Sequence, residues 1–417
     1  MSNSGFKITK KDSKSRARLG ILNTPHGKIL TPSYVFVGTY GKFLHLSPKD
    51  IARTNSQVFI ANTFHLWQKT LKNKIKSGFI HKSFGLKIPI MTDSGGFQVL
   101  SLAFGDKNKV GKFMTGLPAQ AGDAKADTSY KRSKIKITQK GVYFNFKGPD
   151  AKGIEDPRFS NRASRGPNWD KKLFLGPELS MKLQSKIGAD ITFAFDQITS
   201  PLDNYEYNRK AVELTDKWAK ICLKAKNPKQ MLFGIVQGGL FKSLRIKSAK
   251  SIGSMPFDGF GIGGSYTKKQ IAKMLKWVIP YLPEEKPRHL LGVGKVEDVF
   301  EAIENGIDTF DCVIPTREAR HGRLYTKTGH MDIRKGKYVG DAKIIESGCK
   351  CPTCSLGISR NKIRALLKNE NPKQNAKGQR WCLMHNMWFF NNLLAEIRNS
   401  IQKNKLSQLK KKYLKYF

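Results

Sequence analysis

The stretch Ile307-Asp308-Thr309-Phe310-Asp311-Cys312-Val313-Ile314-Pro315-Thr316-Arg317-Glu318-Ala319-Arg320 joins a short apolar strand to a polar turn. The strand is predicted to end at the carboxylate of Asp311, and Pro315 then breaks the apolar run. A carboxylate at a strand end can be held rigidly enough to act as a nucleophile. Arg317 and Arg320 can grip the phosphates or base edges of a nucleic acid. Taken alone, the segment could also be a surface turn with solvated charges.

This strand is the last of eight short apolar runs, and helical patterns separate most of them. The runs lie near Tyr34–Val37, Val58–Ala61, Ile88–Thr92, Asp190–Phe195, Met231–Val236, Gly259–Ile262, His289–Val293 and Ile307–Phe310. Helices are predicted over Leu179–Ile187, from near Asp203, over Ile271–Ile279 and over Val296–Ile303. Alternating strands and helices indicate a parallel sheet, and eight units predict an α/β fold of the (β/α)8 TIM-like barrel type. A doubly wound open sheet is the alternative.

In such a barrel the chemistry lies at the carboxyl ends of the strands. Carboxylates, polar amides and glycines stand at those positions in this chain. They are Asn62-Thr63, Asp93, Asp196, Gln237, Gly263-Gly264, Gly294 and Asp311. Unrelated strand ends would not be expected to share this character, so the pattern predicts a pocket lining.

One connection, from Gly105 to Pro177, is too long for a simple strand–helix unit and is polar, basic and glycine-rich. Within it, Lys134–Ile137 and Val142–Phe146 alternate in polarity, which predicts a hairpin. The inward residues would be Ile135, Ile137, Val142, Phe144 and Phe146. The flanks, 107–131 and 148–172, are predicted to be mobile loops.

We expect three regions: a barrel catalytic domain over residues 1–340, including an insertion at 105–177, a zinc-binding subdomain over 341–402 and a basic tail over 403–417. The tail carries six lysines among Leu406, Leu409, Tyr413 and Leu414. It is predicted to form a solvated amphipathic helix, and contact with an RNA backbone is the alternative.

Lysine and arginine outnumber aspartate and glutamate by 75 to 32, and the net charge is +43. Such an excess favours a polyanionic partner such as nucleic acid. Compositional drift towards lysine and asparagine is the competing explanation. The chain lacks an apolar run of about 18 residues, so no membrane span is expected. The polar start, Met1 to Arg18, does not resemble a signal peptide, which favours a cytoplasmic protein.

Three of the six cysteines cluster in Cys349-Lys350-Cys351-Pro352-Thr353-Cys354. This spacing is typical of a metal site rather than a disulfide framework. A fourth ligand would come from downstream, where His385 precedes an apolar helical stretch and Cys382 is a rival. A Cys3His set suits one structural zinc ion, because it leaves no open coordination position. A loop of free thiols is the alternative.

The run Met91-Thr92-Asp93-Ser94-Gly95-Gly96-Phe97-Gln98 predicts a buried strand that ends at Asp93. The two glycines would let the backbone approach a ligand closely. Phe97 offers a flat face on which a base can stack. Taken alone, Ser-Gly-Gly is a common turn.

Together, these motifs resemble those of tRNA-guanine transglycosylase, also called queuine tRNA-ribosyltransferase, of the bacterial type. The resemblance lies in Asp93–Gln98, Val236-Gln237-Gly238-Gly239, Phe257 through Gly264, Arg288–Gly294, Phe310–Arg320 and the Cys349, Cys351, Cys354 and His385 set. It covers nearly the whole chain outside the 105–177 region and the tail. The chain ends soon after the zinc region, unlike the archaeal form with its appended RNA-binding domain.

The resemblance implies exchange of guanine at the wobble position of G-U-N anticodons for a 7-deazaguanine, in queuosine modification of tRNA. Asp311 would be the nucleophile that attacks ribose C1′, and Asp93 the general acid and base. Base recognition would fall to Asp196, Gln237 and Gly264, with the base held between Phe97 and Leu291. Arg317 and Arg320 would read the nucleotides that flank the wobble position. The resemblance further implies a homodimer and no ATP or redox cofactor.

Two departures concern the incoming base. The family's Asp-Glu-Cys-Thr run is Asp196-Gln197-Ile198-Thr199 here, and Ser265–Lys269 replaces the usual Leu-x-x-Gly-Glu. A glutamate at each place is associated with 7-aminomethyl-7-deazaguanine, which we favour over queuine. A non-catalytic tRNA-binding paralogue and a hydrolase of free nucleosides are alternative functions. The presence of Asp93 and Asp311 argues against the paralogue, and the zinc motif argues against the hydrolase.

Overall fold

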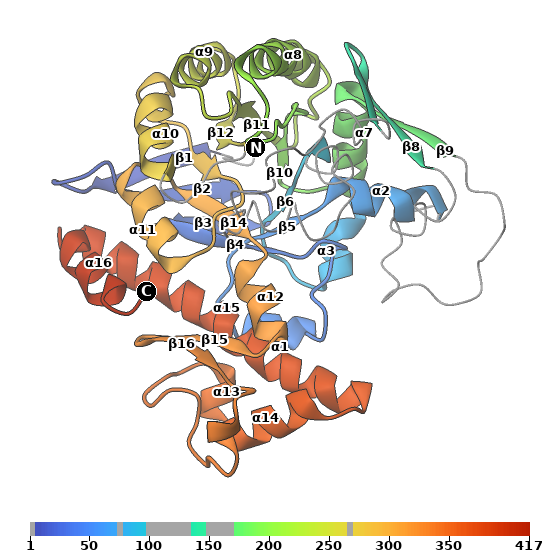
Figure 1. Ribbon diagram of the computed structural model, residues 1–417. Helices are drawn as coiled ribbons and strands as arrows, with labels where there is room; N and C mark the ends of the chain where they lie inside the picture. The colour runs from blue at the N-terminus through green and yellow to red at the C-terminus, as the bar shows by residue number, and fades with distance from the viewer. Residues whose placement is uncertain (1–4, 73–77, 97–134, 147–170, 265–269) are drawn as a thin grey trace.

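Eight parallel strands close into a barrel at the centre of the protein (Figure 1). The structure is a computed structural model, and it describes residues 5–72, 78–96, 135–146, 171–264 and 270–417. The strand order around the barrel is β10-β11-β12-β13-β14-β4-β5-β6. The bounds are β4 Ser33–Val37, β5 Phe59–Ala61, β6 Ile90–Thr92, β10 Ile191–Phe193, β11 Met231–Val236, β12 Gly259–Ile262, β13 Arg288–Leu290 and β14 Thr309–Cys312. The predicted TIM-like barrel is confirmed, and all eight strands lie where the sequence predicts them. Closure of the sheet rules out the open alternative.

Helices follow most of the strands and cover the outside of the barrel (Figure 1). They are α1 Pro48–Ala52, α2 Thr63–Lys72, α3 Phe79–Phe84, α7 Pro177–Ile187, α8 Tyr205–Lys224, α9 Lys242–Gly253, α10 Ile271–Val278 with the 3-10 turn η4 Ile279–Tyr281, α11 Val296–Glu304 and α12 Ile314–Arg320. All four predicted helices are present. Local signals begin them: Pro177 occupies the first turn of α7, and the side chain of Asn204 caps α8 by accepting from the Tyr207 N–H.

An antiparallel sheet closes the amino-terminal end of the barrel. It consists of β1 Gly5–Lys11, β2 Arg18–Thr24 and β3 Gly27–Thr31. Leu22 and Ile29 are fully buried and share one apolar cluster with interior residues of the barrel such as Phe193 and Phe233. Since apolar side chains fill this end, a ligand has access only from the carboxyl-terminal end. The sequence analysis did not anticipate this sheet.

The predicted hairpin is present within the insertion, as β7 Ile135–Thr138 and β8 Gly141–Phe146. Ile135 pairs with Phe144 and Ile137 with Val142, so these four residues, all predicted to point inward, share one face of the hairpin. A third strand, β9 Lys171–Leu175, extends the sheet and was not predicted, because its pairing with β8 is distant in sequence. The sheet packs on the barrel through Phe144. The side chain of Phe146 and most of the flanking segments lie outside the described residues.

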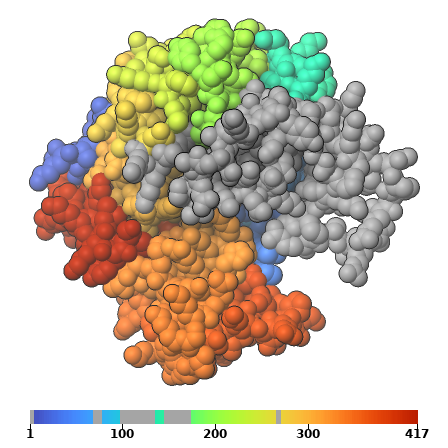
Figure 2. All heavy atoms as spheres, viewed as in Figure 1, coloured from blue at the N-terminus to red at the C-terminus, as the bar shows by residue number. Residues whose placement is uncertain are grey.

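The C-terminal part forms a lobe at the end of the molecule opposite α8 and α9 (Figures 1 and 2). Its elements are β15 Arg323–Thr326, β16 Gly329–Asp332, the 3-10 turn η5 Gly336–Tyr338, α13 Pro352–Ser355, α14 Arg360–Lys368 and the first turns of α15 Pro372–Gln402. The long helix α15 then continues along the barrel, where Arg380 pairs with Asp50 at 2.5 Å. Asn391 also donates to the Thr54 carbonyl at 2.7 Å. One helix thus ties the lobe to the barrel.

The basic tail folds as α16 Leu406–Leu414 and packs against α11 and α15. Leu406 and Tyr413 are buried, and Lys410 pairs with Glu304 at 2.6 Å. The helix is therefore amphipathic as expected, but its apolar face is docked on the barrel rather than solvated. Contact of its other lysines with RNA stays a prediction. Among the described residues, none of the helices is both long and apolar enough to span a lipid bilayer.

Candidate active site

Polar side chains stand at the carboxyl ends of four strands of the barrel. Asp93 follows β6, Asp196 follows β10, Gln237 follows β11 and Asp311 lies near the end of β14. Because parallel strands share their direction, all these ends meet at one rim of the barrel. The sequence-predicted pocket lining is therefore at the end of the barrel that the N-terminal sheet leaves open.

Asp93 is held by donors from the neighbouring strand end. The Thr63 N–H donates to its Oδ1 at 2.9 Å, the Gly95 N–H donates to the same oxygen at 3.1 Å, and Asn62 Nδ2 donates to Oδ2. Burial and, to a smaller extent, the charge of Asp311 raise the pKa of Asp93 from 3.8 to about 7, against the lowering effect of these hydrogen bonds. A carboxyl group with a pKa near neutrality can both donate and accept a proton.

Asp196 and Gln237 form a buried pair beside Asp93. Gln237 Nε2 donates to Asp196 Oδ2 at 2.6 Å, and Ser94 Oγ donates to Oδ1 at 3.1 Å. Burial raises the pKa of Asp196 to about 6, while the bonds from Gln237 and Ser94 lower it. At neutral pH this carboxylate is therefore ionised and accepts hydrogen bonds. Gln237 Oε1 is buried without a hydrogen-bond partner among the described residues, so the pair retains capacity for a polar ligand.

Gly263 and Gly264 leave space that side chains would fill. A Cβ on Gly263 would lie 2.8 Å from Gln237 Nε2. At Gly264, where φ is +107°, it would lie 2.5 Å from a guanidinium nitrogen of Arg245. Arg245 is fully buried and donates to the carbonyls of Gly239 at 2.8 Å and Gly263 at 2.7 Å. It lies in α9, which the sequence analysis did not predict, and it holds the loops after β11 and β12 together.

The carboxylate of Asp311 lies at the same rim and is mostly buried, with 15% of its side chain exposed. Its Oδ1 accepts from His289 Nε2 at 3.1 Å and from the Gly292 N–H at 3.3 Å. Leu291, between these two donors in sequence, is partly buried and packs against the interior cluster of the barrel. The sequence analysis placed Leu291 at the site but missed His289, which resembled one more residue of a buried strand.

The remaining predicted base and RNA contacts lie around this cluster. Phe97 lies outside the described residues, as does the Ser265–Lys269 loop. Arg317 and Arg320 are partly exposed and lie one turn apart on α12, directly after β14. Gln197, at one of the two departures from the family pattern, is buried, and its Nε2 donates to Tyr207 Oη at 3.0 Å.

The four predicted metal ligands come together in the C-terminal lobe. The three sulfur atoms of Cys349, Cys351 and Cys354 and a ring nitrogen of His385 all lie within 4.8 Å of one another. His385 Nδ1 is 3.3 Å from Cys351 Sγ, while its Nε2 donates to the Tyr325 carbonyl at 2.7 Å. That bond orients the ring so that Nδ1 faces the sulfurs, which is the usual support for a metal-ligating histidine. The group could therefore hold a metal ion, and Cys382 is not part of it.

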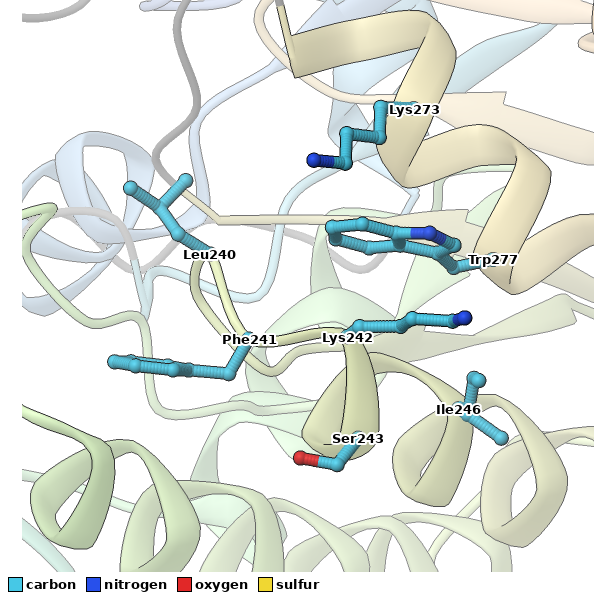
Figure 3. A pocket seen from close by; sticks show the side chains of 7 residues that line it. All are labelled: Leu240, Phe241, Lys242, Ser243, Ile246, Lys273 and Trp277. Atoms are coloured by element: carbon cyan, nitrogen blue, oxygen red, sulfur yellow. The ribbon is translucent and has the colours of Figure 1, made fainter.

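An open groove on the outer face of α9 and α10 is separate from the carboxylate cluster (Figure 3). Apolar and basic side chains, including Phe241, Trp277, Lys242 and Lys273, line it. Lys273 Nζ lies 5.5 Å from the centre of the Trp277 ring. Because none of the lining residues carries a carboxylate, the groove lacks the chemistry found at the rim.

Comparison with known proteins identifies the family. The family model described as queuine tRNA-ribosyltransferase matches residues 12–120 and 161–417. A relative in Archaeoglobus fulgidus is 36% identical over 424 residues, which cover 98% of this chain and 99% of the relative. The queuine tRNA-ribosyltransferases of Clostridium perfringens and Clostridium acetobutylicum are 34% and 35% identical, and each match covers 98% or more of both chains. The chain therefore belongs to the queuine tRNA-ribosyltransferase family, whose members are pentosyltransferase enzymes of tRNA modification.

Proposed function

We propose that the protein exchanges guanine at the wobble position of tRNAs with G-U-N anticodons for a 7-deazaguanine, through a covalent aspartyl-ribosyl intermediate. The observation that carries this proposal is that Asp311 and Asp93 stand at the same rim of the barrel, near enough for the charge of Asp311 to act on Asp93. Asp93 has a pKa of about 7, raised in part by the charge of Asp311, and the polar pair Asp196–Gln237 lies beside it.

In the first half-reaction, a carboxylate oxygen of Asp311 attacks ribose C1′. The bond between C1′ and N9 of guanine breaks, and its electron pair stays with the departing base. Asp93, protonated in part at neutral pH, donates a proton to that base. The carboxylate stabilises the oxocarbenium-like transition state before it captures the sugar as an ester.

In the second half-reaction the incoming base gives its N9 proton to Asp93 and attacks C1′. The ester bond then breaks, and its electron pair returns to the Asp311 carboxylate. The sugar is inverted twice, so its configuration is retained. Both carboxylates end in their starting protonation states, and the exchange needs no external oxidant or reductant.

Recognition of the base follows from the donors and acceptors beside the two catalytic carboxylates. Ionised Asp196 can accept from the N1–H and the exocyclic amine of guanine, as a bidentate carboxylate does. Gln237 and the backbone at Gly264 would meet the opposite edge, and Leu291 would cover one face of the ring. Binding of the base would replace the internal bond between Gln237 and Asp196 and would offer a donor to Gln237 Oε1, which is buried without a partner among the described residues.

The structure of the pocket bears on which 7-deazaguanine enters. Family members that carry a glutamate at position 197 have an acidic partner there for an aminomethyl group, whereas Gln197 here is neutral and bonded to Tyr207. A 7-aminomethyl substituent would need a backbone carbonyl as its acceptor instead. We keep 7-aminomethyl-7-deazaguanine as the first candidate and queuine, which the names of the clostridial relatives contain, as the second.

The Cys3His group would hold one structural zinc ion, since three sulfur ligands and one imidazole suit tetrahedral Zn²⁺ and leave no position for a reacting water. Cys351→Ser should lower both the zinc content and the melting temperature, because the ion links α13 to α15. Elemental analysis and thermal unfolding measure the two effects. A variant with a full metal complement and an unchanged melting temperature would contradict the assignment.

Base exchange on a G-U-N tRNA tests the proposed function, with labelled guanine, 7-aminomethyl-7-deazaguanine and queuine offered in parallel. Incorporation of a 7-deazaguanine into intact tRNA, but not into free guanosine, is the expected result. The preferred base identifies the substrate. A tRNA with adenine at the wobble position is the matched control and should stay unlabelled. Binding of tRNA without incorporation of any base would instead favour a non-catalytic paralogue.

A further inference from the structure

We propose that His289 is the positioning residue of the nucleophile: its Nε2–H holds Oδ1 of Asp311 and leaves Oδ2 as the atom that attacks the ribose. The inference rests on the proposed role of Asp311. It extends that role to a side chain that lies on a barrel strand rather than in a rim loop, and it states which carboxylate oxygen reacts.

His289 is anchored at both ring nitrogens. It is fully buried on β13, directly opposite Thr309 of β14 in the parallel register. Nδ1 lies 2.9 Å from Thr309 Oγ1, and Nε2 lies 3.1 Å from Asp311 Oδ1. The ring also packs against Phe193, with 5.2 Å between ring centres. Two polar contacts and one aromatic contact therefore set the orientation of the imidazole before any substrate binds.

These contacts determine which nitrogen carries the proton. A neutral ring protonated only at Nδ1 would place the Nε2 lone pair against the carboxylate oxygen of Asp311, and the two would repel each other. Protonation at Nε2 removes this conflict, and the Thr309 hydroxyl can then donate to Nδ1. The neutral Nε2–H form thus satisfies both neighbours.

A second donor acts on the same oxygen, because the Gly292 N–H lies 3.3 Å from Asp311 Oδ1. Within the described parts of the chain, Oδ2 has no hydrogen bond. The unbonded oxygen keeps its lone pairs for attack, while the other oxygen fixes the plane of the carboxylate. When the ester forms, Oδ2 becomes the bridging atom and Oδ1 the carbonyl oxygen, which can keep both hydrogen bonds. Such preorganisation lowers the barrier to attack without binding the RNA more tightly.

Two variants separate donation from packing. His289→Leu removes the donor and keeps an apolar side chain, whereas His289→Gln places an uncharged amide N–H near the position of Nε2. We measure the single-turnover rate of the covalent protein–tRNA adduct on denaturing gels, together with the affinity for tRNA. The leucine variant should form the adduct about 100-fold more slowly, a loss typical of a misplaced catalytic group, with tRNA affinity within about 2-fold of wild type. The glutamine variant should recover most of the rate.

Rescue by glutamine is a readout that packing alone would not give, because the amide restores the N–H donor without restoring the imidazole ring. A leucine variant with the wild-type rate would overturn the proposal, and so would a glutamine variant as slow as the leucine variant. If His289→Leu does not fold, Thr309→Val tests the other anchor and should slow the adduct by roughly 3-fold. An adduct rate unchanged in that variant would count against the proposal.

Failure of this inference is distinguishable from failure of the proposed function. If the wild type forms no adduct with a G-U-N tRNA, the role of Asp311 itself is wrong. If the wild type forms the adduct and all three variants match its rate, Asp311 keeps its role and only the positioning role of His289 is lost.

Discussion

The two ends of the barrel use the same residue type in opposite ways. At the carboxyl-terminal rim, aspartates follow strands; at the amino-terminal floor, aspartates directly precede them. The rim set is Asp93, Asp196 and Asp311, and the floor set is Asp190, Asp258 and Asp308. Both sets stand on the same strands or on neighbouring strands. The two sets of aspartates therefore differ mainly in the side chains and backbone groups that contact their carboxylates.

Each floor aspartate bridges two strands and also has a basic partner. Asp308, for example, accepts from the Arg288 N–H at 2.8 Å and pairs with the buried side chain of Arg18 at 2.6 Å. Asp258 likewise accepts from the Leu232 N–H at 2.7 Å and pairs with Lys226 at 2.6 Å. Each of these carboxylates therefore joins a neighbouring strand to a basic side chain and stabilises the barrel.

Asp190 follows the same rule although it lies in a cluster with two histidines. Its Oδ1 is 2.7 Å from His26 Nδ1, and its Oδ2 accepts from the Ile90 N–H at 2.8 Å. The rings of His26 and His81 stack with 3.5 Å between centres. These three side chains could in principle hold a metal ion, but both oxygens of Asp190 already have partners. The cluster therefore belongs with the structural contacts of the floor.

The rim aspartates have neutral donors in place of strong cations. Asp93 and Asp196 form no ion pair within the described part of the chain, and Asp311 has only the imidazole of His289. Burial therefore raises the pKa of Asp93 to about 7 and that of Asp196 to about 6. A carboxylate without a cationic partner stays available for proton transfer or attack. This electrostatic difference separates the aspartates of the rim from the structural aspartates of the floor.

The largest expected effect of this contrast is the loss of activity in Asp311→Asn. The amide cannot attack C1′, so base exchange should fall by at least about 1000-fold. Because the amide oxygen of asparagine can still accept from His289 and from the Gly292 N–H, the melting temperature and the affinity for tRNA should stay near wild type. Exchange assays and thermal unfolding on the same preparation check both statements. A variant that fails to fold, or one that keeps its activity, would contradict the role of Asp311 as the nucleophile.

Asp308→Asn, three residues earlier on the same strand, is the matched control and should show the opposite pattern. It leaves the guanidinium of Arg18 buried without its carboxylate, and breaking a buried ion pair in this way costs about 3–5 kcal/mol. Urea unfolding should show this loss of stability, while the folded fraction keeps its exchange activity per molecule. Wild-type stability in this variant would mean that the floor contacts are dispensable.

The smallest expected effect is a change in how stability depends on pH in Asp93→Asn. The unfolded chain releases the proton of Asp93 near pH 4, whereas the folded protein keeps it up to about pH 7. The unfolded state thus binds fewer protons between these values, and the contribution of Asp93 to stability falls as pH rises. In Asp93→Asn the titrating carboxyl group is absent, so this decrease in unfolding free energy with rising pH should disappear.

Unfolding free energies measured at pH 5, 6, 7 and 8 test this sign. The difference between Asp93→Asn and wild type should move in favour of the variant by about 2.5 kcal/mol across the series. Asp311→Asn should keep a shallower version of the wild-type slope, because the charge of Asp311 is one cause of the raised pKa of Asp93. Parallel curves for wild type and Asp93→Asn would show that Asp93 is ionised at all these values.

Sequence patterns located the rim residues because strand ends can be read from short-range periodicity. Asp93, Asp196, Gln237 and Asp311 each follow a short apolar run, and the barrel then brings such ends together. The hairpin at 135–146 was predictable for a similar reason, since its two strands are adjacent in the chain. The resemblance to a known family supplied the roles of these residues, which their spacing alone could not.

Three features depended on contacts between distant segments. Arg245 lies in α9, a helix that was not predicted, and its guanidinium joins the loops after β11 and β12. The ion pair between Arg18 and Asp308 joins residues that are 290 positions apart in the sequence. The third strand of the insertion sheet, β9, pairs with β8 across a long intervening segment. Since a sequence pattern reports burial but not partners, none of these could be predicted.

The sequence by itself determined the barrel, the set of rim carboxylates and the cysteine–histidine group, because local periodicity, chain order and ligand chemistry decide them. Only the tertiary structure decided how charge is distributed over the two ends of the barrel. The floor carboxylates acquired basic partners from remote segments, while Asp93 and Asp196 acquired neutral amides and hydroxyls. The physical reason is that the pKa of a buried carboxyl group depends on the donors and charges within a few ångströms, and folding chooses those neighbours.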